Sequence, residues 1–345
     1  MKIFNPRTLL RESLFDLQSY SSAREEFAME SGMSFLDANE NPFESGLNRY
    51  PDPQQQKLKN KLAELKQIAP SKIILGNGSD ELLDLVIRCF CEPGKDSVIT
   101  LPPTYGMYGI LSRINGVRVR EVPLDPNFQP DLQAVTQAVD DRTKLLFLCS
   151  PNNPSGNRLN TESITALLDN FPGIVVLDEA YADFSSVSML KMLDNYPNLV
   201  ILQTFSKAYG LAGARLGAGY ASREIIHLLS KIKLPYNVNL LTQQVALERL
   251  EDTTGIEREI KEILDQRALL KARLELLPFV QKVFPSEANF LLVRVDDAQR
   301  RYNQFLEAGI VVRNRSKELH CEQSLRITVG TPQENDRLLE VAKSF

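Results

Sequence analysis

Residues 199–217 read Leu-Val-Ile-Leu-Gln-Thr-Phe-Ser-Lys-Ala-Tyr-Gly-Leu-Ala-Gly-Ala-Arg-Leu-Gly, and this stretch decides the fold. Its first four residues form a short apolar run of the kind that makes a buried parallel strand. A polar turn punctuated by glycine follows, so we expect Lys207 at the carboxyl end of a strand. Open α/β sheets bind their ligands at that edge. The stretch therefore predicts an α/β fold with a ligand site around Lys207.

The residues around Lys207 suit an amine that forms an imine beside a bound phosphate. A lysine amine can attack an aldehyde, and Thr204, Ser206 and Arg215 are suited to hold phosphate oxygens. Pyridoxal 5′-phosphate (PLP) carries both an aldehyde and a phosphate. Taken alone, Lys207 is more simply a solvated loop residue among 40 Lys and Arg, so the hypothesis depends on the rest of the chain.

Composition narrows the class of protein. A chain of 345 residues exceeds a typical single core, which predicts two domains or one large sheet domain with a smaller partner. A net charge of −4 argues against nucleic acid or an anionic membrane as the main partner. Four scattered cysteines and two histidines favour free thiols over disulfides, and no metal site is expected. No apolar run has the length of a signal peptide or a membrane span, so we expect a cytoplasmic protein.

Short apolar runs alternate with helical patterns between residues 72 and 222, which predicts a mostly parallel sheet flanked by helices. The expected strands lie at 73–75, 98–101, 117–122, 145–148, 174–177 and 199–202, with a further strand at 217–220 that returns from the site. Later in the chain, strands are expected at 289–293, 310–312 and 325–329. Near the N-terminus a short helix is expected at 9–17 and a strand-like start at 35–38.

Three regions follow from this pattern. We expect an N-terminal arm and small-domain segment at 1–49, a large PLP-binding domain at 50–243, and a small C-terminal α+β domain at 244–345. There is no long linker, so the small domain is expected to close directly on the large one.

Four polar clusters follow predicted strands, at 76–80, 151–156, 178–181 and 204–207. In a parallel sheet these strand ends share one edge, so the clusters are expected to converge. The first cluster, Gly-Asn-Gly-Ser-Asp, would bring backbone amides at a helix start to a phosphate. A dinucleotide-binding fingerprint is the alternative, but its third glycine is missing because Glu81 stands there.

Asp178 ends an apolar strand, where an unpaired carboxylate is costly. A protonated pyridine nitrogen would stabilise it, and the carboxylate would keep the ring an electron sink. A helix N-cap or a salt bridge accounts for Asp178 about equally well. Tyr181 and Asn153 would reach the phenolate oxygen of the ring and Tyr105 would stack on its face, although turn or core positions are the simpler alternative for each.

Three motifs resemble the fold-type I PLP-dependent aminotransferases. They are Ser-Pro-Asn-Asn-Pro-Ser-Gly at 150–156, Asp-Glu-Ala-Tyr at 178–181, and Ser-Lys with an arginine eight residues after the lysine. Within this family the chain is similar to the histidinol-phosphate aminotransferases. That similarity rests on Tyr-Ser-Ser-Ala-Arg at 20–24, Asn-Glu-Asn-Pro at 39–42, Arg-Tyr-Pro at 49–51, Pro-Thr-Tyr-Gly-Met-Tyr at 103–108, Arg313, and Leu-Arg-Ile-Thr-Val-Gly at 325–330. It spans nearly the whole chain and departs from the family at Ser155, where threonine is commoner.

The resemblance implies roles for individual residues. Lys207 would form the imine, Asp178 would bind the pyridine nitrogen, and Tyr105 would lie against the ring. Tyr181 and Asn153 would bind the phenolate oxygen. The remaining implied contacts are phosphate binding by Ser79, Asp80, Thr204, Ser206 and Arg215, a homodimer in which Tyr50 reaches the cofactor phosphate of the partner subunit, and substrate binding by Tyr20, Arg313 and Arg326. Asn39 is assigned to the substrate as a hypothesis of its own, and a turn residue is the equal alternative. The segment 315–323 matches no motif of the family and is interpreted as a solvated loop.

The implied reaction is transamination of L-histidinol phosphate with 2-oxoglutarate, which gives imidazole acetol phosphate and glutamate in histidine biosynthesis. Two related alternatives stay open, an aminotransferase for aromatic amino acids and a lyase similar to threonine-phosphate decarboxylase. A non-catalytic PLP-binding protein is less compatible with an intact lysine, aspartate and arginine set. A nicotinamide oxidoreductase is less compatible still, because the third glycine is missing.

Overall fold

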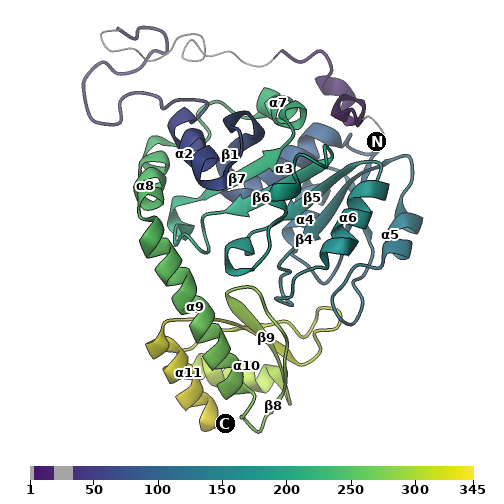
Figure 1. Ribbon diagram of the computed structural model, residues 1–345, viewed down its shortest axis with the longest axis vertical. Helices are drawn as coiled ribbons and strands as arrows, with labels where there is room; N and C mark the ends of the chain where they lie inside the picture. Colours follow the sequence, from purple (N-terminus) through teal and green to yellow (C-terminus); the bar gives the residue numbers. More distant parts are fainter. Residues whose placement is uncertain (1–3, 19–33) are drawn as a thin grey trace.

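Two β-sheets, one of seven strands and one of four, organise the molecule (Figure 1). The computed structural model describes residues 4–18 and 34–345. The large sheet lies among helices in the upper part of Figure 1, and the small sheet lies below it, joined by the long helix α9 (Thr253–Leu274). No helix within the described ranges is both long enough and apolar enough to cross a lipid bilayer.

The large sheet has the strand order β1-β7-β6-β5-β4-β2-β3. Its strands are β1 (Ile73–Asn77), β2 (Ser97–Thr100), β3 (Arg118–Glu121), β4 (Thr143–Cys149), β5 (Ile174–Asp178), β6 (Leu199–Thr204) and β7 (Leu216–Ala221). Strand β7 is antiparallel to both of its neighbours, so the other six strands run in one direction. The mostly parallel sheet expected from the sequence is confirmed.

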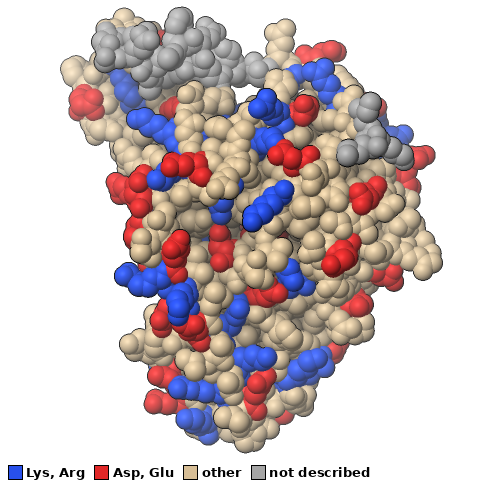
Figure 2. Space-filling model, viewed as in Figure 1, with Lys and Arg blue, Asp and Glu red and all other residues tan. Residues whose placement is uncertain are grey.

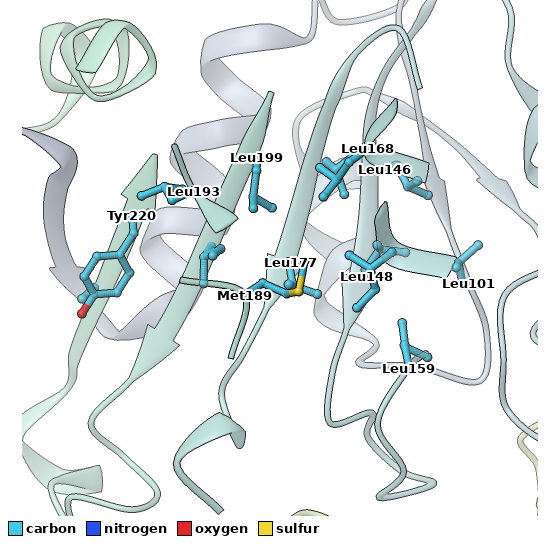
Figure 3. Close-up of a cluster of buried hydrophobic side chains, with 14 of the residues drawn as sticks. Leu101, Leu146, Leu148, Leu159, Leu168, Leu177, Met189, Leu193, Leu199 and Tyr220 are labelled. Carbon is cyan, nitrogen blue, oxygen red and sulfur yellow. The ribbon is translucent and has the colours of Figure 1, made fainter. Parts of the chain in front are cut away.

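Helices cover both faces of this sheet, which is why its central strands are apolar throughout. Along β6, Leu199 and Ile201 join one buried cluster, while Val200 and Leu202 join the cluster on the opposite face. Figure 3 shows part of the first cluster. The helices of this domain are α2 (Gln56–Lys66), α3 (Gly78–Phe90), α4 (Met107–Ile114), α5 (Leu132–Ala138), α6 (Thr161–Asn170), α7 (Arg223–Ile232) and α8 (Leu240–Glu251).

The small sheet is antiparallel, with the order β10-β11-β9-β8. Its elements are β8 (Val280–Val283), β9 (Phe290–Val295), β10 (Arg313–Asn314), β11 (Ser324–Thr328), α10 (Ala298–Glu307) and α11 (Pro332–Lys343). Leu291 and Val293 of β9 pack in a core shared with the helices. Phe290 and Leu292, which alternate with them, pack against residues of the large domain. One face of the small sheet is therefore turned toward the large domain.

Several local expectations differ from the structure. The helix expected at 9–17 is replaced by two short 3-10 helices, Pro6–Leu9 and Glu12–Leu14, and the Arg11 N–H between them donates to Cys89 O. Residues 35–38 form no strand, and the strand expected at 310–312 begins only at Arg313. Strand β8 was not anticipated. The domain boundary suggested after residue 243 falls inside α8 and stays a proposal.

Candidate active site

A cavity of about 230 Å³ lies at the carboxyl edge of the large sheet. Its lining comes from the segments that end or follow β1, β2, β4, β5 and β6, and from the start of β7. The lining residues are Ser79, Asp80, Tyr105, Cys149, Asn153, Asp178, Ala180, Tyr181, Thr204, Ser206, Lys207 and Arg215. All ten cofactor-binding residues expected within one chain lie in this set, although their individual roles remain predictions.

Two glycines allow the walls of the cavity to approach each other. Gly78 has φ +74°, and its N–H donates to Arg215 O at 2.9 Å. A Cβ on Gly217 would lie 2.4 Å from Ser79 N, so only glycine fits beside the first turn of α3. These contacts hold the Arg215 side chain at the N-terminus of α3.

The N-terminus of α3, Arg215 and two hydroxyl groups form a site suited to a phosphate. Arg215 Nη1 lies 3.4 Å from Ser206 Oγ, and Thr204 Oγ1 lies 3.1 Å from the same oxygen. Ser79 and Asp80 stand in the first turn of α3, where backbone N–H groups lack helical partners. Free amides, hydroxyls and a guanidinium are the donors that phosphate oxygens need.

Asp178 is buried at the end of β5 and accepts two hydrogen bonds. The donors are Tyr108 Oη at 2.7 Å and the N–H of Ala180 at 3.0 Å. Burial raises the pKa of Asp178 to about 6. A cationic group placed against this carboxylate would offset that burial, as a protonated ring nitrogen does.

Sequence reasoning assigned no role to Tyr108. Its side chain is fully buried and stacks on Phe147, with ring centroids 5.1 Å apart. A buried tyrosine hydroxyl needs a polar partner, and here that partner is Asp178. The one available signal was its position three residues after Tyr105 on a helix start, which is too weak to indicate the contact.

Lys207 follows β6, and its amine is biased toward the neutral form. Burial lowers the pKa of Lys207, and the guanidinium groups of Arg326 and Arg215 lower it further. Lys207 Nζ lies 5.9 Å from the ring centre of Tyr181. A neutral amine is both a nucleophile and a base, so this environment supports the two tasks expected of the lysine.

Tyrosine hydroxyls close two sides of the cavity. Tyr105 Oη donates to Asp80 Oδ1 at 3.1 Å. Burial raises the pKa of Tyr181, which keeps its hydroxyl protonated and able to donate. Cys149 also lines the cavity, and burial raises the pKa of its thiol, so it is a poor nucleophile there. Together, the phosphate donors, the lysine and the buried carboxylate match the phosphate, aldehyde and ring nitrogen of PLP.

Among the described residues, four of the expected substrate or partner contacts are absent from the lining of this cavity, namely Asn39, Tyr50, Arg313 and Arg326. Tyr20 lies outside the described residues. Tyr50 stacks on Tyr236 with ring centroids 4.6 Å apart, and Asn39 belongs to the same segment, which loops out beyond α2 (Figure 1). Arg313 lies on β10.

Arg326, on β11, reaches the rim of the cavity. Its Nη1 donates to Asn153 Oδ1 at 2.6 Å. On the face shown in Figure 2, basic and acidic side chains are interspersed. Across residues 4–18 and 34–345, no group of three or more His, Cys, Asp or Glu is placed to hold a metal ion.

Comparison with known proteins identifies related chains over nearly the full length. A family profile described as aminotransferase class I and II matches residues 36–341. A histidinol-phosphate aminotransferase of Flavobacterium johnsoniae is 56% identical over 347 residues, covering 99% of both chains.

Two solved structures have a fold similar to that of this chain. A histidinol-phosphate aminotransferase from Clostridium acetobutylicum superposes with a TM-score of 0.80 at 26% identity, over 87% of this chain and 91% of that one. The enzyme of the same name from Sinorhizobium meliloti, solved with pyridoxal-5′-phosphate, gives 0.77 at 26% identity, over 86% and 83%.

Proposed function

The chain belongs to the class I and II aminotransferases, and from this premise we propose that it is a PLP-dependent enzyme that transfers the amino group of L-histidinol phosphate. The observation that carries the proposal is the convergence of Lys207, Asp178 and Arg215 on one cavity. Relatives more than 50% identical over the whole chain are named for this reaction, a step of histidine biosynthesis.

The residues of the cavity divide the binding of PLP among them. Arg215, Ser206, Thr204 and the amides of Ser79 and Asp80 hold the phosphate. A second group of residues orients the ring. Asp178 binds the ring nitrogen, Tyr181 and Asn153 bind the phenolate oxygen, and Tyr105 lies against the ring face. When bound, PLP supplies an aldehyde that takes up the substrate amine and a ring that delocalises the electrons released at the substrate's Cα.

Lys207 is the group that moves the proton. Burial and two arginines lower the pKa of Lys207, which favours Nζ as the acceptor of the proton that the substrate loses at Cα. Asp178 stays ionised while it faces a ring cation, and Tyr108 and the Ala180 amide hold the carboxylate in place.

The substrate's anionic group is met by the small sheet. Arg326 already lies at the cavity rim through Asn153, and Arg313 stands directly opposite Arg326 in the β10–β11 pair. We assign 2-oxoglutarate as the amino acceptor, which becomes glutamate, with imidazole acetol phosphate as the other product. Arginine suits both the phosphate of one substrate and the carboxylates of the other.

The remaining features of the proposal concern assembly and location. A homodimer would bring Tyr50 of each chain to the cofactor phosphate of its partner, which accounts for the absence of Tyr50 from the cavity of its own chain. Tyr20 and Asn39 are proposed to contact the substrate. The protein is proposed to act in the cytoplasm on small molecules, with neither nucleic acid nor membrane as a partner.

Absorbance spectroscopy tests the proposal directly. L-Histidinol phosphate added to the PLP-loaded protein without a keto acid should convert the absorbance band of the enzyme-bound aldehyde form into that of the amine form. Phenylalanine, tyrosine and histidine should do so poorly. Release of carbon dioxide from a phosphorylated amino acid would instead identify a lyase.

Replacement of Lys207 tests whether this residue is the nucleophile and the proton carrier. Lys207→Ala should bind PLP only non-covalently and should abolish turnover, because both the nucleophile and the proton carrier are lost. Ser185→Ala, a substitution outside the cavity lining, is the matched control and should retain activity. An active Lys207→Ala enzyme would contradict the assignment.

A further inference from the structure

The small sheet turns a face rich in arginine toward the large domain. Arg326 pairs in register with Leu292, whose side chain packs in the core of the large domain, so the two share a face. Arg326 also lies over the ring of Phe290, 5.3 Å from its centre. Arg313 stands opposite Arg326 in the ladder and therefore lies on the same face.

Arg315 continues this face beyond the end of β10. Its N–H donates to Ser324 O at 2.8 Å, which extends the β10–β11 register by one residue beyond Asn314. Because side chains alternate along extended chain, Arg315 lies on the face of Arg313 and Arg326. These three residues are called the arginine cluster below. The sequence predicted a loop at 315–323, and the segment is indeed loop and turn between β10 and β11, but the Arg315 N–H at its start still pairs with Ser324.

The arginine cluster carries an excess of positive charge. Among the described residues, Glu318 is the one carboxylate that forms an ion pair with the cluster, through Arg315 Nη1 and Glu318 Oε1 at 2.7 Å. Three guanidinium groups and one carboxylate leave two positive charges in excess. Burial and the neighbouring Arg315 lower the pKa of Arg326, which reflects the cost of holding these cations together.

Several buried polar atoms in and near Arg315 also lack a hydrogen-bond partner among the described residues. They are Arg315 Nε, Ser316 Oγ and Glu318 Oε2. Buried polar atoms are normally paired, and an unpaired one points to a missing partner. The charge of Arg315 is felt in the cavity, since burial raises the pKa of Tyr181 while Arg326 and Arg315 oppose that rise.

We propose that Arg315 is a specificity-determining residue that binds the phosphate group of the substrate, and that Glu318 is the positioning residue that holds Arg315 on the arginine-rich face. The inference rests on the proposed function and names the group that selects its substrate. A phosphate dianion brings two negative charges to the cluster on one group, whereas each carboxylate of glutamate carries only one. Guanidinium is also the side-chain group whose donors best fit phosphate oxygens.

The test compares Arg315→Gln with the wild-type holoenzyme in both half-reactions. Arg315→Gln should raise the KM for L-histidinol phosphate about tenfold, the effect of one charged hydrogen bond, and leave kcat within about twofold. The KM for L-glutamate should change less than about threefold. Arg315→Lys should recover part of the loss, because it restores charge without the planar donor pair.

Arg300→Gln is the matched control. Arg300 is exposed on α10 of the same domain, so the variant removes one positive charge at a place remote from the site. Its KM for L-histidinol phosphate should equal that of the wild type. An Arg315→Gln enzyme with unchanged KM, or with equal losses for both substrates, would overturn the inference.

Glu318→Gln tests the positioning role. It should shift the KM for L-histidinol phosphate in the same direction as Arg315→Gln but by less. The double variant should be no worse than Arg315→Gln alone, because Glu318 acts through Arg315. Fully additive losses would show that Glu318 has another task and would remove it from the proposal.

Binding of inorganic phosphate separates this inference from the proposed function. Calorimetric titration of the PLP-loaded protein with phosphate should give a dissociation constant about tenfold weaker for Arg315→Gln than for the wild type. If the wild type ignores L-histidinol phosphate yet phosphate binding still depends on Arg315, the proposed function fails and the anion site stands. If phosphate binding is the same in both proteins, the anion site fails whatever the substrate is.

Discussion

Asp178 is a carboxylate that the large sheet places where water barely reaches it, with 3% of its surface exposed. Its two donors, Tyr108 and the Ala180 amide, do not compensate fully, because burial still raises its pKa to about 6 from an ordinary 3.8. A raised pKa means that the folded protein binds this proton more tightly than the unfolded chain does. Folding stability from this group is therefore present below pH 4 and is lost as pH rises through 6.

Asp178→Asn should change the stability of the cofactor-free protein and its affinity for PLP in opposite directions. At pH 7 the variant should be more stable than the wild type by up to about 3 kcal/mol, because a buried charge is removed. The gain should vanish near pH 4, where the wild-type carboxyl is protonated. Denaturant unfolding at both pH values measures the gain.

The same variant should bind PLP more weakly and should not catalyse transamination, since a neutral amide does not hold the ring nitrogen in its protonated form. A PLP titration followed by absorbance gives the affinity. An equal stability difference at pH 4 and pH 7 would contradict the account of Asp178 as a strained, ionised group.

At the scale of elements, the contact between β7 and the start of α3 shapes the phosphate site. Gly217 of β7 lies so close to Gly78 and Ser79 that a Cβ at position 217 would come within 2.4 Å of their backbone atoms. Backbone cannot move aside as a flexible side chain can. The antiparallel strand β7 thus determines where the helix presents its free amides.

Gly217→Ala should push the N-terminus of α3 away from the sheet. We expect a loss of about 3 kcal/mol in the free energy of unfolding, together with weaker PLP binding. Gly213→Ala is the matched control, because Gly213 is exposed, has no positive φ and has no atom within 4 Å of its added Cβ. Unfolding curves and PLP titrations that are the same for the two variants would show that the close approach does not control the phosphate site.

At the scale of the whole molecule, large apolar side chains are exposed on the segment that precedes α2. Leu36, Phe43 and Leu47 are 91%, 80% and 56% exposed, and Leu234 and Leu241 add further apolar surface at 66% and 55%. Burial of these side chains against a second copy of the chain would be favourable. This exposed apolar surface supports the proposed homodimer, for which light scattering should give a mass twice the 38.9 kDa of the chain.

Mixing two inactive variants would show whether the dimer shares its sites. Tyr50→Ala damages the site of the partner and Lys207→Ala damages its own, so a heterodimer of the two keeps one intact site. Refolding the two variants together should restore activity at limiting PLP. The matched control, Lys207→Ala with Arg215→Ala, damages one site in each chain and should restore nothing. If neither mixture gains activity, Tyr50 does not serve the partner's site.

The sequence by itself determined the parallel sheet, the cavity-lining residues and the family. Apolar runs, turn residues and the motifs at 150–156, 178–181 and 204–215 are local features, so they can be recognised without knowledge of the fold. Since a parallel sheet brings its strand ends to one edge, local features were sufficient to collect ten lining residues into one site.

Only the tertiary structure showed which further side chains contact the residues of that site. Tyr108 meets Asp178 across 70 residues of sequence, and Arg315 joins Arg326 only through the register of β10 and β11. A register is set by packing between strands that are distant in sequence, and a shift of one residue would turn Arg315 to the other face. No local pattern carries that information, so the sequence indicated the loop but not that Arg315 lies beside Arg326.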